Sequence, residues 1–226
     1  MLNVLPSSIA RRLKDHQGLI ADGHADVTVM FADLVNFTQL TESLSPEQMV
    51  ALLNTIFSGF DELTEKHGLE KIKTIGDAYM VVGGLTHDGK DYTRDIADLA
   101  LEMRQFMASH PKLSRFNLGI HTGIATGPVV AGVIGTKRFI YDLWGDTVNI
   151  ASRLTDEAVQ GMIQVDKTTY NRIRHDYVFE APATIHVKGK GEMVMYRLTG
   201  HTSDDAHRAN VLPLRPSQEP PASSMA

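Results

Sequence analysis

Val27-Thr-Val-Met-Phe-Ala-Asp33-Leu-Val-Asn-Phe-Thr38 is the stretch that decides the fold. Its first half is a run of β-branched and apolar residues, which predicts a buried strand. A carboxylate, Asp33, follows where this strand is expected to end, and a short polar loop comes next. A lone carboxylate at the end of a buried strand is costly unless a cation meets it. The stretch therefore indicates a cation site.

A second segment, residues 69–83, supplies a companion carboxylate. Two short apolar runs are joined there by Gly76 and Asp77, and glycine provides the positive φ that a tight two-residue hairpin turn needs. Taken singly, either aspartate is more often an ordinary turn or capping residue. If the hairpin lies beside the first strand, however, Asp33 and Asp77 converge on one point, which is an arrangement for a divalent metal.

The composition is that of an ordinary globular protein. The 226 residues suffice for one domain with tails, or at most two small domains, with 42% hydrophobic and 22% charged residues. The absence of cysteine excludes disulfides and thiol catalysis, and the net charge of −5 argues against general nucleic-acid binding. No apolar run approaches the length of a membrane span, so the chain as given is expected to be cytoplasmic.

Three regions follow from the pattern along the chain. Residues 1–21 form a connector helix and linker, with the helix starting near Pro6 and placing Ile9 and Leu13 on one stripe. Residues 22–199 form the main domain. Residues 200–226 are too polar and proline-rich to pack, which predicts a disordered tail.

Two long helices and several strands are expected within the main domain. The first helix starts at Ser45 with a capping box and ends before Gly68, and the second runs from about Tyr92 to Ser109. Another helix starts near Thr147. The predicted strands after the hairpin are Arg115–Ala125, Met162–Val165, Tyr177–Ala181, Thr184–Val187 and Met193–Leu198. This order predicts an α+β fold with a ferredoxin-like βαββαβ core and additional strands and helices, the helices covering one face of a largely antiparallel sheet.

The glycine-rich stretch 127–135 fits neither a dinucleotide fingerprint nor a phosphate-binding P-loop. Its glycines predict close approach of backbone to backbone, in strands bent toward a partner subunit.

Four ordered motifs resemble those of the class III nucleotidyl cyclases, and of the bacterial homodimeric adenylyl cyclase type in particular. The motifs are Phe-Ala-Asp33-Leu-Val-Asn-Phe-Thr38, Lys71-Ile-Lys-Thr-Ile-Gly-Asp77, Tyr141-Asp-Leu-Trp-Gly-Asp-Thr-Val-Asn149-Ile-Ala-Ser-Arg153 and Val187-Lys-Gly-Lys-Gly191. The resemblance covers roughly residues 22–199. It implies a reaction that turns ATP into cyclic AMP and pyrophosphate, assisted by two Mg²⁺ or Mn²⁺ ions per site.

The resemblance also implies where the metals and phosphates bind. Asp33 and Asp77 match the bridging carboxylates, with the carbonyl of Leu34 as a further oxygen ligand; hard oxygen donors suit Mg²⁺ or Mn²⁺. The terminal phosphates would meet backbone amides at the start of a helical turn. Those amides belong to Val35, Asn36, Phe37 and Thr38.

By the same resemblance, Lys73 and Asp142 read the base. Lys73 would donate to the adenine ring edge and Asp142 would accept from the exocyclic amine, whereas guanine presents a carbonyl that would face the carboxylate. Asn149 and Arg153, four apart on a helix and so on one face, match the ribose-orienting asparagine and the transition-state arginine. Outside this motif, such a pair would ordinarily be a solvated polar face.

Several basic residues remain open as triphosphate contacts. Lys188 matches the family lysine, and Lys190, Lys137 and Arg138 compete with it. None of the ten histidines has metal-ligand spacing; His121 is expected to be structural, with pH sensitivity as an alternative if it lies at an interface.

Both half-sites of the family lie in one sequence, which by similarity implies a homodimer with two shared active sites. Asn3-Val-Leu-Pro6 followed by Ile9-Ala resembles the connector that joins many class III cyclase domains to upstream regulators, which implies a regulatory or membrane domain in a longer parent protein; the alternative is an N-terminal helix that docks on its own domain. The alternatives are a guanylyl cyclase and a catalytically silent nucleotide-binding regulatory domain. A diguanylate cyclase is disfavoured because Gly83-Gly84 is followed by Leu-Thr.

Overall fold

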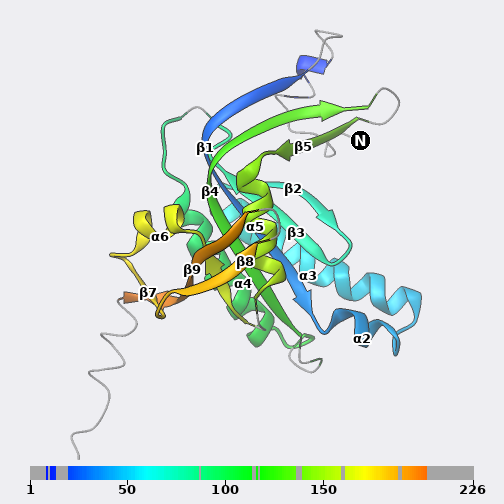
Figure 1. The fold of residues 1–226 in the computed structure, drawn as a ribbon. Helices are drawn as coiled ribbons and strands as arrows, with labels where there is room; N and C mark the ends of the chain where they lie inside the picture. The colour runs from blue at the N-terminus through cyan, green and yellow to red at the C-terminus, as the bar shows by residue number, and fades with distance from the viewer. Residues whose placement is uncertain are drawn as a thin grey trace, which may run out of the picture.

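The structure is a computed structural model that describes residues 9, 11–13, 20–86, 88–113, 116, 118–135, 139–158, 161–187 and 190–202. Its centre is a sheet whose strand order is β2-β3-β1-β4-β6-β9-β7, with β5 paired to β4 and β8 paired to β9 (Figure 1). The strands are β1 (Ala21–Val35), β2 (Glu70–Ile75), β3 (Ala78–Gly83), β4 (Gly119–Ile134), β5 (Ile140–Trp144), β6 (Ile163–Val165), β7 (Tyr177–Phe179), β8 (Ala183–Val187) and β9 (Gly191–His201). The helices are α2 (Phe37–Thr41), α3 (Pro46–Lys66), α4 (Thr93–Ser109), α5 (Asp146–Asp156) and α6 (Lys167–Ile173).

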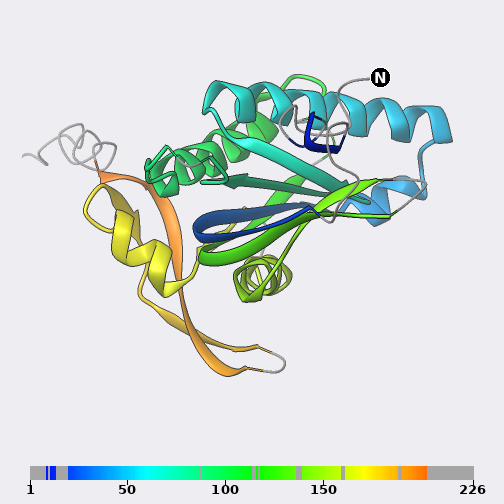
Figure 2. The ribbon, with the colours of Figure 1, turned by 90° about the horizontal axis from the view of Figure 1, so that it is seen from above.

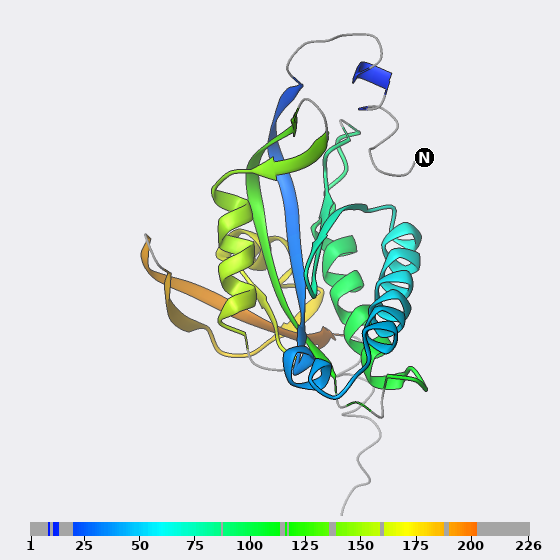
Figure 3. The same ribbon diagram turned by 90° about the vertical axis from the view of Figure 1, so that its right-hand side faces the viewer.

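β1 lies at the centre and is apolar on both of its faces. Met30, Ala32 and Leu34 belong to the core that α3 and α4 cover, whereas Val27 and Val29 belong to the core that α5 covers. Figure 3 shows α5 on one side of the sheet and α3 and α4 on the other, and Figure 2 shows the same layers from above. The predicted α+β class is confirmed. The prediction that helices cover one face only was wrong, because a strand buried on both faces needs a cover on each.

The ends of the long helices follow the predicted signals. The Ser45 side chain accepts from the backbone N–H of Gln48, and the Gln48 side chain accepts from the backbone N–H of Ser45 at 2.9 Å. This reciprocal pair is the predicted capping box. Gly68, just beyond α3, has a φ of 66°, as expected for a helix stop.

The predicted hairpin is present beside the central strand. Ile75 pairs with Ala78, so Gly76 and Asp77 are the two turn residues, and Gly76 has a φ of 62°. A positive φ at the first turn residue alone is the pattern of a type II′ turn. β3 then pairs with β1 along its length.

The end of the first strand differs from the expectation. β1 continues two residues beyond Asp33, to Val35, so this carboxylate lies within the sheet and not at its edge. The chain then enters α2 directly through Asn36, which has a left-handed conformation (φ 64°, ψ 10°). The short helix stands where a polar loop was predicted from the residue types, and it agrees with the helical turn that the family resemblance implied.

The glycine-rich stretch is part of one long strand, β4. A Cβ atom on Gly123 would lie 2.3 Å from the carbonyl oxygen of Ala151, and one on Gly127 would lie 2.8 Å from Oγ1 of Thr147. Gly123 precedes the predicted stretch; within it, the close approach to another backbone is that of Gly132, where a Cβ would lie 2.6 Å from the carbonyl oxygen of Ile20 in the same chain. The prediction of strands bent toward a partner stays a prediction.

Two elements were not predicted. β5 lies within the motif that contains Asp142, for which only a chemical role was predicted. α6 was not predicted, although Asp166 is its N-cap and accepts from the N–H of Thr169 at 2.9 Å. An acidic cap before the run that becomes α6 was the available signal.

The described part of the connector is helical at residues 9 and 11–13. Ile9 and Ile20 are buried in a small cluster with Val133 of β4. Pro6 and the predicted tail from residue 203 onward lie outside the described residues. None of the described helices combines the length and the apolar character needed to cross a membrane.

We expect Gly123→Ala to destabilise the fold by about 1–3 kcal/mol, because the new methyl group would overlap the backbone of α5. Thermal or denaturant unfolding measures this change. Gly200→Ala is the matched control, because a Cβ there has no heavy atom within 4 Å. Equal stability of the two variants would contradict the close packing of α5 on β4.

Candidate active site

Two aspartates converge at one end of β1. Asp33 is directly opposite Ala78 in the β1–β3 register, and Asp77 is the neighbour of Ala78 in the turn. Burial is the largest cause that raises the pKa of Asp33, and the negative charge of Asp77 raises it further. Asp33 Oδ1 is buried and has no hydrogen-bond partner within the described part of the chain. The pair therefore concentrates negative charge beside a buried carboxylate oxygen, an arrangement that suits a cation.

Two further ionisable residues lie close to this pair. His121 of β4 is the cross-strand neighbour of Asp33, and its charge would lower the pKa of Asp33. Asp156, at the end of α5, raises that pKa. Neither residue was predicted to lie at this site. For His121, the alternation of side chains along β4 was an available signal.

The backbone after Asp33 passes directly from β1 into the short helix α2. Asn36 makes no side-chain hydrogen bond that caps α2, and Phe37 anchors the helix in the core at 8% exposure. Leu34 is buried, and Val35 ends the strand. The side chain of Thr38 lies outside the described residues. Of the four predicted phosphate-binding residues, Val35 is thus in the strand, Asn36 is the left-handed cap, and Phe37 and Thr38 begin the helix.

The two predicted base-reading residues are in contact. Lys73 of β2 donates from Nζ to Oδ2 of Asp142 in β5, although the residues are 69 positions apart. Asp142 Oδ1 accepts from the backbone N–H of Leu143 at 2.8 Å. The side chains are 31% and 17% exposed, respectively. One salt bridge therefore joins the two strands that are expected to hold the base.

α5 presents the predicted ribose and transition-state residues to the outside. Its buried side faces the sheet through residues such as Ala151 and Leu154, whereas Asn149 and Arg153 are exposed. Arg153 Nη1 donates to Oδ2 of Asp156 at 3.1 Å. These two groups thus point away from the core of their own chain.

One of the competing lysines has a partner. Lys190 donates from Nζ to Asp146 in the first turn of α5, and this contact ties the β8–β9 turn to the helix. Lys188, Lys137 and Arg138 lie outside the described residues.

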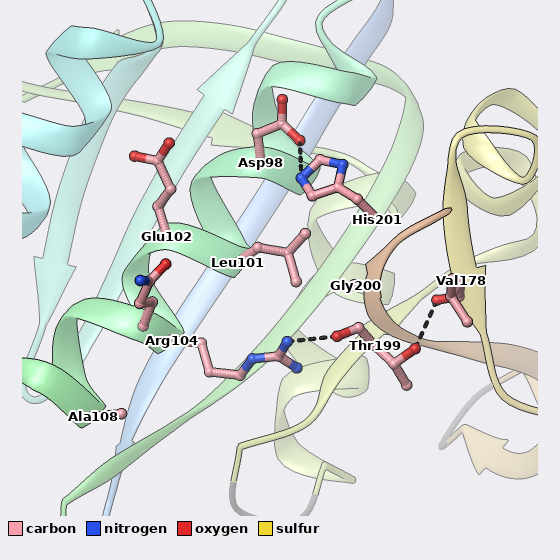
Figure 4. Close-up of a pocket in the computed structure, with 10 residues that line it drawn as sticks. Asp98, Leu101, Glu102, Arg104, Ala108, Val178, Thr199, Gly200 and His201 are labelled. Atoms are coloured by element: carbon pink, nitrogen blue, oxygen red, sulfur yellow. Dashed lines mark hydrogen bonds and ion pairs between the residues drawn. The ribbon is translucent and has the colours of Figure 1, made fainter. Parts of the chain in front are cut away.

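A separate pocket lies between α4 and the ends of β7 and β9 (Figure 4). Its volume is about 530 Å³. In its wall, Oδ1 of Asp98 lies 3.4 Å from Nε2 of His201. Arg104 donates to the carbonyl of Thr199 at 2.6 Å. The pocket is lined by none of the predicted site residues, so we place the candidate active site at the Asp33–Asp77 end of β1.

Comparison with known proteins is in accord with this geometry. The chain matches the adenylate and guanylate cyclase catalytic domain family over residues 19–200. It is 46% identical over 202 residues to an adenylate cyclase of Mycobacterium tuberculosis, which covers 88% of this chain and 45% of the relative. It is 38% identical to a receptor-type guanylate cyclase of Caenorhabditis elegans, over 89% of this chain and 19% of that protein. The chain thus spans less than half the length of these relatives.

Solved structures show the same fold. The guanylate cyclase domain of a Catenaria anguillulae protein, in complex with GTP, aligns with a TM-score of 0.76 at 33% identity, covering 80% of this chain and 100% of that one. The adenylyl cyclase CyaB of P. aeruginosa aligns with a TM-score of 0.74 at 28% identity, covering 79% and 95%. With the four motifs and the paired carboxylates, these matches show that the chain belongs to the class III adenylate and guanylate cyclase catalytic domain family.

Proposed function

We propose that this chain converts ATP to 3',5'-cyclic AMP and pyrophosphate. The observation that carries the choice of ATP is the contact between Lys73 and Asp142. A cationic donor beside a carboxylate acceptor complements the ring nitrogen and exocyclic amine of adenine, whereas guanine would turn a carbonyl toward the carboxylate. The mycobacterial adenylate cyclase relative supports the same choice.

The residues at the end of β1 fit a divalent metal. A cation would give the buried Oδ1 of Asp33 a partner. It would also offset the repulsion between Asp33 and Asp77. We infer that these carboxylates and the carbonyl of Leu34 hold two Mg²⁺ or Mn²⁺ ions. Bound ions of this kind supply Lewis acidity toward the attacking hydroxyl and the phosphates.

The chain's own groups perform the remaining work. The amides of residues 35–38 bind the terminal phosphates together with Lys188, the lysine that matches the family motif, whereas Lys190 forms an ion pair with Asp146. Asn149 orients the ribose. Arg153 stabilises the charge that develops on the α-phosphate through its fork of donors.

We infer a homodimer with two shared sites. Asn149 and Arg153 are exposed on the outer side of α5, where they can serve a substrate held by the aspartates of a second copy. Because the chain spans less than half of its relatives, we also propose a longer parent protein with an upstream regulatory or membrane domain. We propose that the cyclase domain lies in the cytoplasm, because ATP is its proposed substrate.

We expect Asp33→Asn to abolish cyclase activity and to raise the thermal stability of the metal-free protein at neutral pH. The pKa of Asp33 is raised in the folded state, so its ionisation opposes folding. That penalty is absent below the unfolded-state pKa and complete above the folded-state pKa. The gain should therefore disappear in acid. Unfolding in EDTA at several pH values tests this, and a less stable variant at neutral pH would contradict it.

Incubation of the purified chain with ATP or GTP and Mn²⁺ tests the substrate directly. We expect cyclic AMP as the main product, and about a tenfold or larger loss of ATP use in Lys73→Glu with Asp142→Cys. Preference of the wild-type chain for GTP would establish the guanylyl cyclase alternative. No product from either nucleotide would favour the silent regulatory domain.

Mixing two inactive variants tests the shared site. Asp33→Ala lacks the metal site and Arg153→Ala lacks the transition-state donor, so each homodimer should be nearly inactive. In a mixed dimer, one site combines the intact Asp33 of one chain with the intact Arg153 of the other. Random exchange makes half the dimers mixed, each with one working site of two, so about one quarter of wild-type activity should return.

Differently tagged chains provide the control, because their co-purification proves exchange of subunits. No recovery of activity despite proven exchange would place the whole site within one chain.

A further inference from the structure

Tyr141 of β5 lies between two separate groups of apolar side chains. It packs against the core that α5 covers, which includes Val29 and Leu143. It also packs against the cluster formed by Ile9 and Ile20 with Val133. The described residues of the connector therefore reach β5 through this one ring.

β5 depends on such packing for its position. It pairs with β4 alone and lies off the main strand order, so only one of its edges is fixed by a β-ladder among the described residues. Its register places Tyr141 opposite Val133 and Asp142 opposite Gly132. Gly132 offers no side chain against which Asp142 could pack. Beyond the ladder with β4 and the contacts of its own carboxylate with Lys73 and the N–H of Leu143, the position of Asp142 therefore depends on the packing of its neighbours in β5.

Ionisable groups surround the Tyr141 hydroxyl. Burial is the main cause that raises the pKa of Tyr141 to about 12, with contributions in the same direction from the charges of Glu70 and Asp22 and an opposing one from Arg12. The phenol therefore stays neutral at physiological pH. Arg12 itself is bonded to Asp22, with Nη2 donating to Oδ1 at 3.1 Å.

β2 and β5 each contribute one residue to the surroundings of the Tyr141 hydroxyl and one residue to the predicted base-reading pair. β2 holds Glu70 and Lys73, and β5 holds Tyr141 and Asp142. Glu70 Oε1 is buried without a partner in the part of the chain that the structure describes. A displacement of Tyr141 would thus open space beside a buried carboxyl and move the residue next to it.

We propose that Tyr141 is a positioning residue that holds Asp142 in place for base reading, by fixing β5 between the core and the connector. The expected effect on the KM for ATP rests on the proposed function. The expected effect on the position of β5 rests on the packing alone. The ring, and not the hydroxyl, provides the hold, since it makes the contacts to both clusters.

Steady-state kinetics test the consequence for the base. We expect Tyr141→Ala to raise the KM for ATP at least about tenfold, the scale of one lost polar base contact, with much less change in kcat. Tyr141→Phe should keep wild-type values because it retains the ring. Tyr170→Ala is the matched control: Tyr170 is a partly buried tyrosine of α6 that packs on the other core, so its loss should leave the KM unchanged.

Trp144 gives a readout that needs no activity. It is the only tryptophan of the chain and ends β5, with 38% exposure. Tyr141→Ala should shift its emission and increase its quenching by acrylamide, and Tyr141→Phe and Tyr170→Ala should not. If Tyr141→Ala fails to fold by circular dichroism, Leu13→Ala weakens from the connector side the cluster against which Tyr141 packs, and it should change the KM and emission in the same direction, by less.

The outcomes separate the two claims. Unchanged Trp144 emission and quenching in the folded variant overturn the positioning role, whether or not the wild type turns over ATP. An unchanged KM in an active enzyme overturns it as well. A wild type without cyclase activity overturns the proposed function, while the Trp144 measurements still decide whether Tyr141 holds β5.

Discussion

A carboxylate buried inside the central strand is the constraint on which this structure depends. Asp33 lies two residues before the end of β1, with β3 on one side and β4 on the other. Burial and the charge of Asp77 both raise its pKa, so the fold carries a local electrostatic penalty. Such penalties persist at functional sites because the surrounding structure over-determines them. Here the long ladders on both sides of β1 and the two apolar cores hold Asp33 in place.

The same double-sided core determines where the other functional groups can stand. α5 must cover the second face of β1 and β4, and glycines at the points of contact let it come close. A helix that buries one side on its own sheet can offer only its other side to a ligand. Asn149 and Arg153 occupy that outer side, whereas Asp33 is part of the sheet beneath. The exposed position of these two residues is the feature on which the proposed shared-site homodimer rests.

Local signals in the sequence were sufficient for much of this architecture. The capping box at Ser45, the stop at Gly68 and the turn at Gly76 each depend on a few neighbouring residues, and the structure bears them out. The helix that becomes α5 was predicted, but its place on the second face of the sheet was not, because the start and end signals of a helix do not say which face it covers. The contacts of Lys73 with Asp142, and of Lys190 with Asp146, join distant segments. Only the tertiary fold brings these residues together, so their spacing in the sequence could not predict the contacts. The family resemblance implied that Lys73 and Asp142 act together, but it did not imply a contact between Lys190 and Asp146.

The charged groups proposed to touch the nucleotide differ in how firmly the substrate-free chain holds them. Arg153 is paired with Asp156, but both side chains are about half exposed, at 49% and 55%. Water screens such a pair, so Arg153 can exchange its partner for a phosphate at little cost. The Lys73–Asp142 pair is less exposed, at 31% and 17%, and Asp142 is also fixed by a backbone N–H. Breaking it without compensation would leave a poorly solvated charge. A base that bonds to both groups at once supplies that compensation, whereas a base that satisfies only one does not. Selectivity for adenine would then arise from the cost of parting this pair as much as from the contacts that replace it.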